Sequence, residues 1–334
     1  MADIWNFSNE DLYESGVRQR WQGRIDDEPP CRIHQLIKCH DLHDSFPGPS
    51  KKVNIALLGC AVDEGIRRNK GRVGAKLGPQ ALRVALANKV VHSSNNLNLF
   101  DVGTIVNGKD LAAAQQNLGE AVARVVGKGL LSIVLGGGHE IAFGHFLGLH
   151  ACFPGSTIGV INIDAHFDVR PLLADGSGTS GTPFLQIAQK VAQDGGEFNY
   201  LCIGAQRAAN SPALFRTMQE LGAQYILASE MSANNEECLL KLQKFIGRHE
   251  YIYVSICLDA FASAYAPGVS APQPLGLEPQ VIVPVLKELA QSGKMIAFDI
   301  AELSPPFDEN GQTAQLGAQI IIELIQTLVD AQGE

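Results

Sequence analysis

The sequence predicts an α/β fold with a mainly parallel central sheet, and two patterns along the chain support this. Several short runs are apolar over nearly their full length, as are strands that are covered on both faces. Amphipathic stretches with helical spacing separate these runs. Alternation of this kind is typical of a parallel sheet with helices packed on its faces.

The individual elements follow from the same patterns. The expected strands span residues 53–60, 131–135, 157–163, 200–203, 251–258 and 295–300. A proline at the first helical turn suggests where three of the helices begin, and Gly127 suggests where another ends. The expected helices span residues 79–88, 111–126, 212–221, 279–291 and 313–329.

The composition favours one large domain. The chain has 334 residues, of which 46% are hydrophobic and 18% are charged, so it can bury a large core. We find no internal repeat, low-complexity segment or linker. Residues 1–50 are mixed and polar, and we interpret them as an N-terminal arm packed on a single domain that spans residues 51–334.

Charge and cysteine content limit the partners and the location. The net charge of −9 disfavours binding to nucleic acid, because phosphate backbones repel an acidic surface. Seven cysteines without a CxxC pair are typical of reduced thiols in a cytosolic protein. We see no signal peptide, and no apolar segment long enough to span a bilayer. We therefore expect a cytoplasmic protein with no membrane partner.

Polar side chains gather just after the predicted strands, where the site of a parallel sheet lies. The segment GGGHE at 136–140 follows the strand 131–135, and DAHFD at 164–168 follows 157–163. The strand 251–258 leads to Asp259, with Cys257 two residues before it, and the strand 295–300 contains Asp299 and leads to Glu302. These strand ends predict one shared site.

The DAHFD segment indicates a metal site. Asp164, His166 and Asp168 alternate, so their side chains can point into one space. Carboxylates together with neutral imidazole suit borderline divalent ions such as Mn²⁺. The alternative, a helix cap, needs one such residue and not three. His139 alone could be a structural residue, but DAHFD at a neighbouring strand end favours a ligand.

Three segments resemble signatures of the arginase/agmatinase superfamily: GGxH at 136–139, DAHxD at 164–168, and SICLD at 255–259 with Pro-Gly at 267–268. The resemblance covers roughly residues 53–330. It implies a three-layer αβα arginase-like fold and a catalytic domain. It also implies that Glu302 binds the amidine or guanidinium group of the substrate.

Within this superfamily the chain looks most like the formimidoylglutamases. The resemblance rests on EGIRRNKGRVGA at 64–75, on GGHE at 137–140, on TSGTPF at 179–184 and on APGVSAP at 266–272. It implies hydrolysis of N-formimidoyl-L-glutamate to L-glutamate and formamide in histidine degradation.

The resemblance implies a pair of Mn²⁺ ions in each subunit. It assigns His139, Asp164 and Asp168 to one ion, and Asp164, His166 and Asp259 to the other. Cys257 stands where the family has a second bridging aspartate. A thiolate ligand is softer and would shift the preference toward Zn²⁺ or Fe²⁺. Alternatively, the second ion is weak or absent, or Cys257 is only a small buried strand residue.

Two differences from arginases concern the substrate. Arg170 stands where arginases carry an asparagine, and TSGTPF lacks the histidine that is thought to shuttle protons there. Arginine pairs with carboxylates through two hydrogen bonds, and formimidoylglutamate has two carboxylates. We predict Arg170 and Ser180 as carboxylate anchors, Asp168 as the proton carrier, and Arg67, Arg68, Asn69 and Arg72 as further candidates for substrate contact.

Two alternatives stay open. The chain could be an agmatinase or a guanidino-acid ureohydrolase, which release urea and not formamide. It could also be a non-catalytic binding protein that kept the arginase fold and lost a metal because of Cys257. Relatives in the superfamily form oligomers, so we expect a homo-oligomer of unspecified size.

Overall fold

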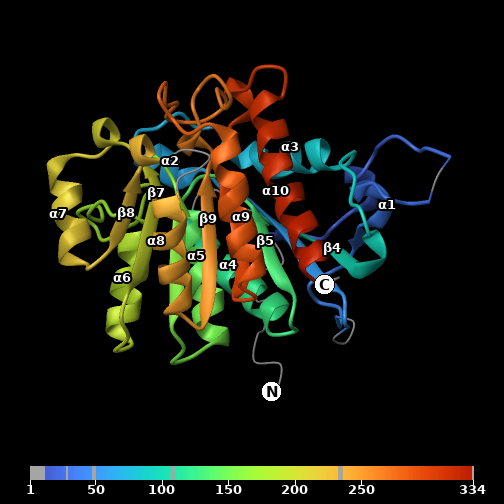
Figure 1. Ribbon diagram of the computed structural model, residues 1–334, viewed down its shortest axis with the longest axis horizontal. Coiled ribbons are helices and arrows are strands. Elements are labelled where there is room, and N and C mark those ends of the chain that lie inside the picture. The colour runs from blue at the N-terminus through green and yellow to red at the C-terminus, as the bar shows by residue number, and fades with distance from the viewer. Residues whose placement is uncertain (1–11, 28, 47–49, 107–109, 232–235, 333–334) are drawn as a thin grey trace.

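The computed structural model describes residues 12–27, 29–46, 50–106, 110–231 and 236–332, and it confirms the α/β class (Figure 1). Its strands form one sheet in the order β1-β4-β3-β5-β10-β9-β6-β7-β8, with β2 also paired to β4. The pairs along this order are parallel except β1 with β4. The strands are β1 Tyr13–Glu14, β2 Lys38–Cys39, β3 Val53–Ala61, β4 Leu97–Val106, β5 Leu131–Leu135, β6 Ile158–Ile163, β7 Asn199–Ala205, β8 Gln224–Leu227, β9 Tyr251–Cys257 and β10 Met295–Ala301.

Helices cover both faces of this sheet and complete three layers (Figure 1). One apolar core packs α3, α8, α9 and α10 on one face, and a second core packs α4, α5, α6 and α7 on the other. Alternate residues of one strand serve the two cores, as in β3, where Leu57 faces the first and Leu58 the second. The helices are α1 Ile33–Leu36, α2 Glu64–Arg68, α3 Gly78–Leu86, α4 Leu111–Val126, α5 Ile141–Cys152, α6 Pro183–Gln193, α7 Pro212–Glu220, α8 Glu236–Gly247, α9 Ile282–Gln291 and α10 Gln312–Ala331.

The elements predicted from the sequence are all present, with small shifts at their ends. The predicted helix 279–291 begins as a 3-10 turn at Pro279–Val281 and becomes α-helical only at Ile282. Sequence patterns missed the longer elements β4, β8, α5, α6 and α8, and also the short elements β1, β2, α1 and α2. Helix α5 lacks a polar stripe because most of its positions are buried, and Gly144 and Gly148 let it approach α4 closely.

Part of the predicted N-terminal arm joins the sheet. Strand β1 pairs antiparallel with β4, and β2 pairs parallel with it. The buried Trp21 indole donates a hydrogen bond to Asp101 of β4 at 2.7 Å, and the same carboxylate accepts two hydrogen bonds from Arg83. These contacts attach the described part of the arm to the main body. The division at residue 50 stays a prediction.

The four strands that carry the predicted site are consecutive in the sheet, in the order β5-β10-β9-β6. The expectation that the ends of β5 and β6 are direct neighbours is wrong, because β10 and β9 lie between them. The chain leaves β5 and β6 toward helices on one face, and leaves β9 and β10 toward helices on the other. Loops that diverge in this way open a crevice at the carboxyl ends. Within the described part of the chain, every helix is too short or too polar to cross a membrane.

Candidate active site

A tight glycine turn carries the chain from β5 to His139. A side chain at Gly137 would place its first carbon 1.9 Å from the Val62 carbonyl oxygen, so glycine is required there. Backbone hydrogen bonds join this turn to β10, from Gly136 to Ile300 and from Glu302 to Gly137. The turn therefore holds His139 and Glu302 beside each other, and the His139 amide donates to a Glu302 carboxylate oxygen at 3.0 Å.

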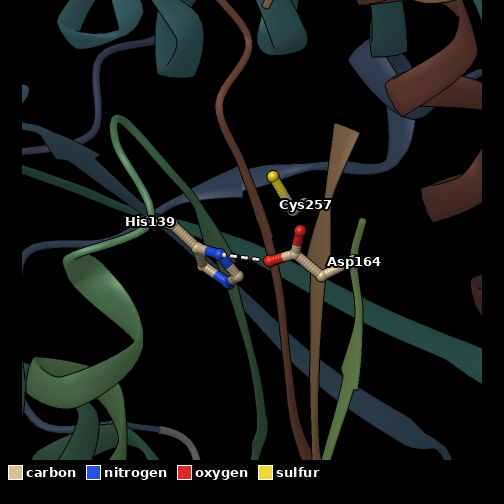
Figure 2. Close-up of side chains that lie close together, drawn as sticks. All are labelled: His139, Asp164 and Cys257. Carbon is tan, nitrogen blue, oxygen red and sulfur yellow. Dashed lines mark ion pairs between the residues drawn. The ribbon is translucent and has the colours of Figure 1, made fainter. Parts of the chain in front are cut away.

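His139, Asp164 and Cys257 form the first group of donor atoms (Figure 2). They come from the ends of β5, β6 and β9, and their ligand atoms lie within 4.8 Å of one another. The His139 Nδ1 atom lies 3.0 Å from an Asp164 oxygen and also 3.0 Å from an Asp168 oxygen. Cys257, and not Asp168, completes the compact group, although Asp168 faces the same imidazole nitrogen.

Asp164 also belongs to a second group, with His166 and Asp259. The His166 Nδ1 atom lies 3.3 Å from an oxygen of each of these carboxylates. The two Asp164 oxygens thus face different imidazoles, one in each group. This arrangement suits a carboxylate that bridges two ions.

Several buried donor atoms of the site have no hydrogen-bond partner among the described residues. They include Asp259 Oδ1 and Glu302 Oε2. Buried polar atoms are normally paired, and unpaired ones indicate a missing ion, water or ligand. The donor set of imidazole, carboxylate and thiol fits a divalent transition metal.

The electrostatics of the site also favour a cation. Burial raises the pKa of Glu302 well above its usual range, and the nearby Asp259 and Glu140 carboxylates raise it further. Burial likewise raises the pKa of Asp259 to about 6. Burial raises the pKa of Cys257, and Asp164 and Asp259 add to the effect, so this thiol keeps its proton unless a cation offsets the surrounding negative charge.

Asp168 and Glu302 have left-handed backbone conformations, with φ of 48° and 71°. Residues other than glycine rarely adopt this conformation, which costs about 1–2 kcal/mol per residue. Both residues lie at the cavity. The fold holds these two carboxylates in place against a local preference, as often occurs at functional sites.

A cavity of about 310 Å³ opens over the two donor groups. The predicted residues Asn69, Arg72, Arg170 and Ser180 line it, together with His139, His166, Asp168, Cys257, Asp259 and Glu302. Asn69 donates to the Ser180 hydroxyl at 3.2 Å. A side chain at Gly181 would meet both Arg170 and Asn69, so the glycine leaves room for them. The predicted ligands and substrate contacts therefore meet at one cavity, with three exceptions. Asp164 lies buried beneath it as the shared donor, and Arg67 and Arg68, also predicted as candidates for substrate contact, do not line it.

The arginines of residues 64–72, which form α2 and the turn after it, differ in their contacts. Arg67 and Arg68 both pair with Glu64. Arg72 donates to the carbonyl oxygens of Val269 and Ser270, and its guanidinium lies over the Phe307 ring, 4.2 Å from the centroid. These cations are therefore already engaged by protein groups, whereas no ion pair of Arg170 is found among the described residues.

Sequence reasoning missed Lys70, Gly71, Ser270 and Ala271, which also line the cavity. Lys70 lies in the turn after α2 and has a left-handed φ of 62°. It is exposed, and no ion pair of its ammonium group is found in the described part of the chain. These residues lie in the motifs at 64–75 and 266–272, but a sequence motif does not show which of its side chains face the cavity.

Comparison with known proteins identifies the family. The family model described as "Arginase family" matches residues 53–326. The chain belongs to the arginase family. Among its relatives in this family, a formimidoylglutamase of Clostridium tetani is 42% identical over 323 residues, which cover 94% of this chain and 95% of the relative. A formimidoylglutamase of Legionella pneumophila (strain Paris) is 44% identical over 309 residues, with 92% and 95% covered.

A solved structure in the family agrees with the fold. The crystal structure of Trypanosoma cruzi formiminoglutamase with Mn²⁺ matches with a TM-score of 0.74 and 27% identity, covering 83% of this chain and 94% of that one. The predicted three-layer arginase-like architecture is confirmed. The two donor groups of this chain are candidates for the dinuclear site of such an enzyme.

Proposed function

We propose that this chain hydrolyses N-formimidoyl-L-glutamate to L-glutamate and formamide, as a metal-dependent step of histidine degradation. One observation carries the proposal: a cavity that places Arg170 beside two metal-donor groups and an unpaired Glu302 carboxylate oxygen. The names of its relatives in Clostridium tetani and Legionella pneumophila support the same substrate.

His139, Asp164, Asp168, His166, Cys257 and Asp259 are the residues that would hold two Mn²⁺ ions. Bound divalent ions lower the pKa of water, which makes hydroxide available near neutral pH, and they act as Lewis acids. The close spacing of the two donor groups, within 4.8 Å in each, fits this role, and Asp168 faces His139 beside them. The proposal includes Cys257 as a ligand of one ion, in the group with His139 and Asp164.

Glu302 orients the substrate's formimidoyl group. Its Oε1 is fixed by the His139 amide, and its buried Oε2 is free to accept hydrogen bonds from the amidinium nitrogens. Such contacts hold the formimidoyl carbon in one position for attack by hydroxide. The carbonyl oxygen of formamide comes from this hydroxide.

Asp168 moves the proton. It lies at the cavity beside His139, at the end of the motif that follows β6. After hydroxide adds to the formimidoyl carbon, Asp168 accepts the proton of the added hydroxyl group and passes it to the glutamate nitrogen. The bond between that nitrogen and the formimidoyl carbon then breaks. The products are L-glutamate and formamide, so the atoms balance with one water consumed.

Arg170 and Ser180 anchor a substrate carboxylate, and Asn69 and Arg72 lie beside them. Arg170 is the guanidinium best placed for this task, because Arg67 and Arg68 are paired with Glu64. Lys70 adds a second positive charge to the same wall. Two cations suit a substrate with two carboxylates better than agmatine, which has none.

The test is an assay of products from a panel of substrates. The Mn²⁺-loaded protein should release formamide from N-formimidoyl-L-glutamate and little urea from arginine, agmatine or guanidino acids. Efficient urea release from a guanidine, with no formamide, would replace the proposal with a ureohydrolase. Failure to retain any ion after loading would favour a non-catalytic binding protein. A cytoplasmic location and a homo-oligomeric state remain proposals from the sequence.

A further inference from the structure

A buried polar cluster lies behind the first metal-donor group, and the proposed reaction does not use it. Its centre is Asp299 on β10, which is fully buried. In the sheet register Asp299 lies beside Ser255 of β9 and Val134 of β5. A carboxylate in the middle of a covered sheet is costly unless hydrogen bonds compensate for its lost hydration.

Three donors converge on this carboxylate. The Ser255 hydroxyl donates to Oδ1 at 2.5 Å. The Tyr253 hydroxyl, at 2.5 Å, and His145 Nδ1, at 2.7 Å, both contact Oδ2. Burial raises the pKa of Tyr253 well above its usual value, and Asp299 raises it further, so the phenol keeps its proton and acts as the donor.

The cluster continues to the metal site through one hydroxyl. Ser255 Oγ lies 2.8 Å from His139 Nε2, while Nδ1 of the same ring faces Asp164 and Asp168. A serine hydroxyl has one proton, and here it is used on Asp299. Ser255 must therefore accept the Nε2 proton of His139, which leaves the lone pair of the neutral ring on Nδ1.

We propose that Asp299 is a positioning residue that, through Ser255, fixes the orientation and tautomer of His139 for metal binding. Metal-bound histidines commonly donate their second nitrogen to a carboxylate or carbonyl, and loss of such a partner typically weakens metal binding 10- to 100-fold. Here a serine relays the effect of the carboxylate. Without Asp299 the Ser255 hydroxyl can rotate and donate to Nε2, which stabilises the wrong tautomer.

The experiment measures Mn²⁺ affinity by calorimetry on the full-length, metal-free protein, with no substrate present. Asp299→Ala and Ser255→Ala, which remove the acceptor and the relaying hydroxyl, should each weaken one of the two Mn²⁺ binding steps by roughly 10- to 100-fold. The double variant should bind Mn²⁺ about as tightly as the single variant with the lower affinity, because both changes break the same relay. Since no turnover is measured, the result is independent of whether formimidoylglutamate is the substrate.

Two control variants separate this role from general stability. Tyr253→Phe removes a donor to Asp299 but leaves the Ser255 contact, so its Mn²⁺ affinity should stay within about threefold of wild type. Asp101→Asn removes an equally buried carboxylate on β4 that pairs with Arg83 and Trp21, so it should lower thermal stability without weakening Mn²⁺ binding.

Wild-type affinity in folded Asp299→Ala protein would overturn the proposal, as would independent, multiplying effects of the two relay changes. If Asp299→Ala does not fold, Ser255→Ala decides alone, because it removes only one hydroxyl. Wild-type Mn²⁺ affinity in that variant would equally overturn the proposal.

Discussion

The two halves of the cavity are built in different ways. The metal half consists of buried side chains at the ends of β5, β6 and β9, such as His139 and Asp164. The substrate half consists of loop residues, and Asn69, Lys70 and Arg170 are exposed. Strand ends fix their side chains through the sheet, whereas loops fix theirs only through local contacts. In the proposed function, the rigid metal half carries the chemistry and the exposed substrate half carries the selectivity.

The largest expected effect comes from breaking the metal half. Asp164→Asn removes the carboxylate shared by the two donor groups. We expect loss of tightly bound Mn²⁺ and a fall in kcat of more than about 100-fold. Metal content after gel filtration and formamide release check this. Near-normal activity in this variant would contradict the assignment of the centre.

The next effect belongs to the substrate half. Arg170→Ala should lower kcat/KM for N-formimidoyl-L-glutamate about 10- to 100-fold, because a charge-assisted hydrogen bond contributes roughly 1.5–3 kcal/mol. A formimidoyl amine without carboxylates should show little change. Arg67→Ala is the matched control, since that guanidinium is paired with Glu64. Equal loss on both substrates would remove Arg170 from the substrate site.

A smaller effect concerns the identity of the metal. Cys257→Asp introduces a hard carboxylate ligand into the first donor group. We expect the preference for Mn²⁺ over Zn²⁺ to rise about tenfold, because carboxylates favour Mn²⁺ and thiolates favour Zn²⁺. Competition between the two ions for the metal-free protein measures it. An unchanged preference would mean that Cys257 is a packing residue.

The smallest expected effect concerns the contact between the halves. Glu140 follows His139 and accepts a hydrogen bond from the Gly65 amide of α2 at 2.7 Å. Burial raises its pKa from 4.5 to about 8, and the Asp63 charge adds to this. The stability contributed by this shift is present below pH 4.5 and is lost as the pH rises through about 8.

The melting temperature of the metal-free protein should therefore fall less between pH 6 and pH 9 in Glu140→Gln than in the wild type. We expect a difference of about 2–4 °C per kcal/mol removed, measured by thermal denaturation. Identical pH profiles for the variant and the wild type would show that Glu140 does not titrate in this range.

The sequence was informative where ligands directly follow apolar strands. Asp164 comes immediately after Ile163, so the end of β6 sets its position. Residues 64–72, which form α2 and the turn after it, were harder to interpret, because the sequence alone does not distinguish the roles of their three arginines. Only the structure shows that Glu64 engages two of them and that Lys70 turns toward the cavity.

Buried charge explains two other failures of sequence reasoning. Strand β4 was missed because Asp101 interrupts its apolar run, and its partners Arg83 and Trp21 are distant in sequence. Asp299 could be noted as a polar residue in a strand. Its donors, however, come from separate elements, so the cluster exists only after the sheet and α5 have packed.

The most direct test of the paired-metal account is a titration of metal-free protein with Mn²⁺ while formamide release from N-formimidoyl-L-glutamate is followed. We predict no release in the presence of a chelator, and full activity only after two equivalents of Mn²⁺ have bound per chain. Equal release by the chelated protein, or full activity with a single bound ion, would contradict the account.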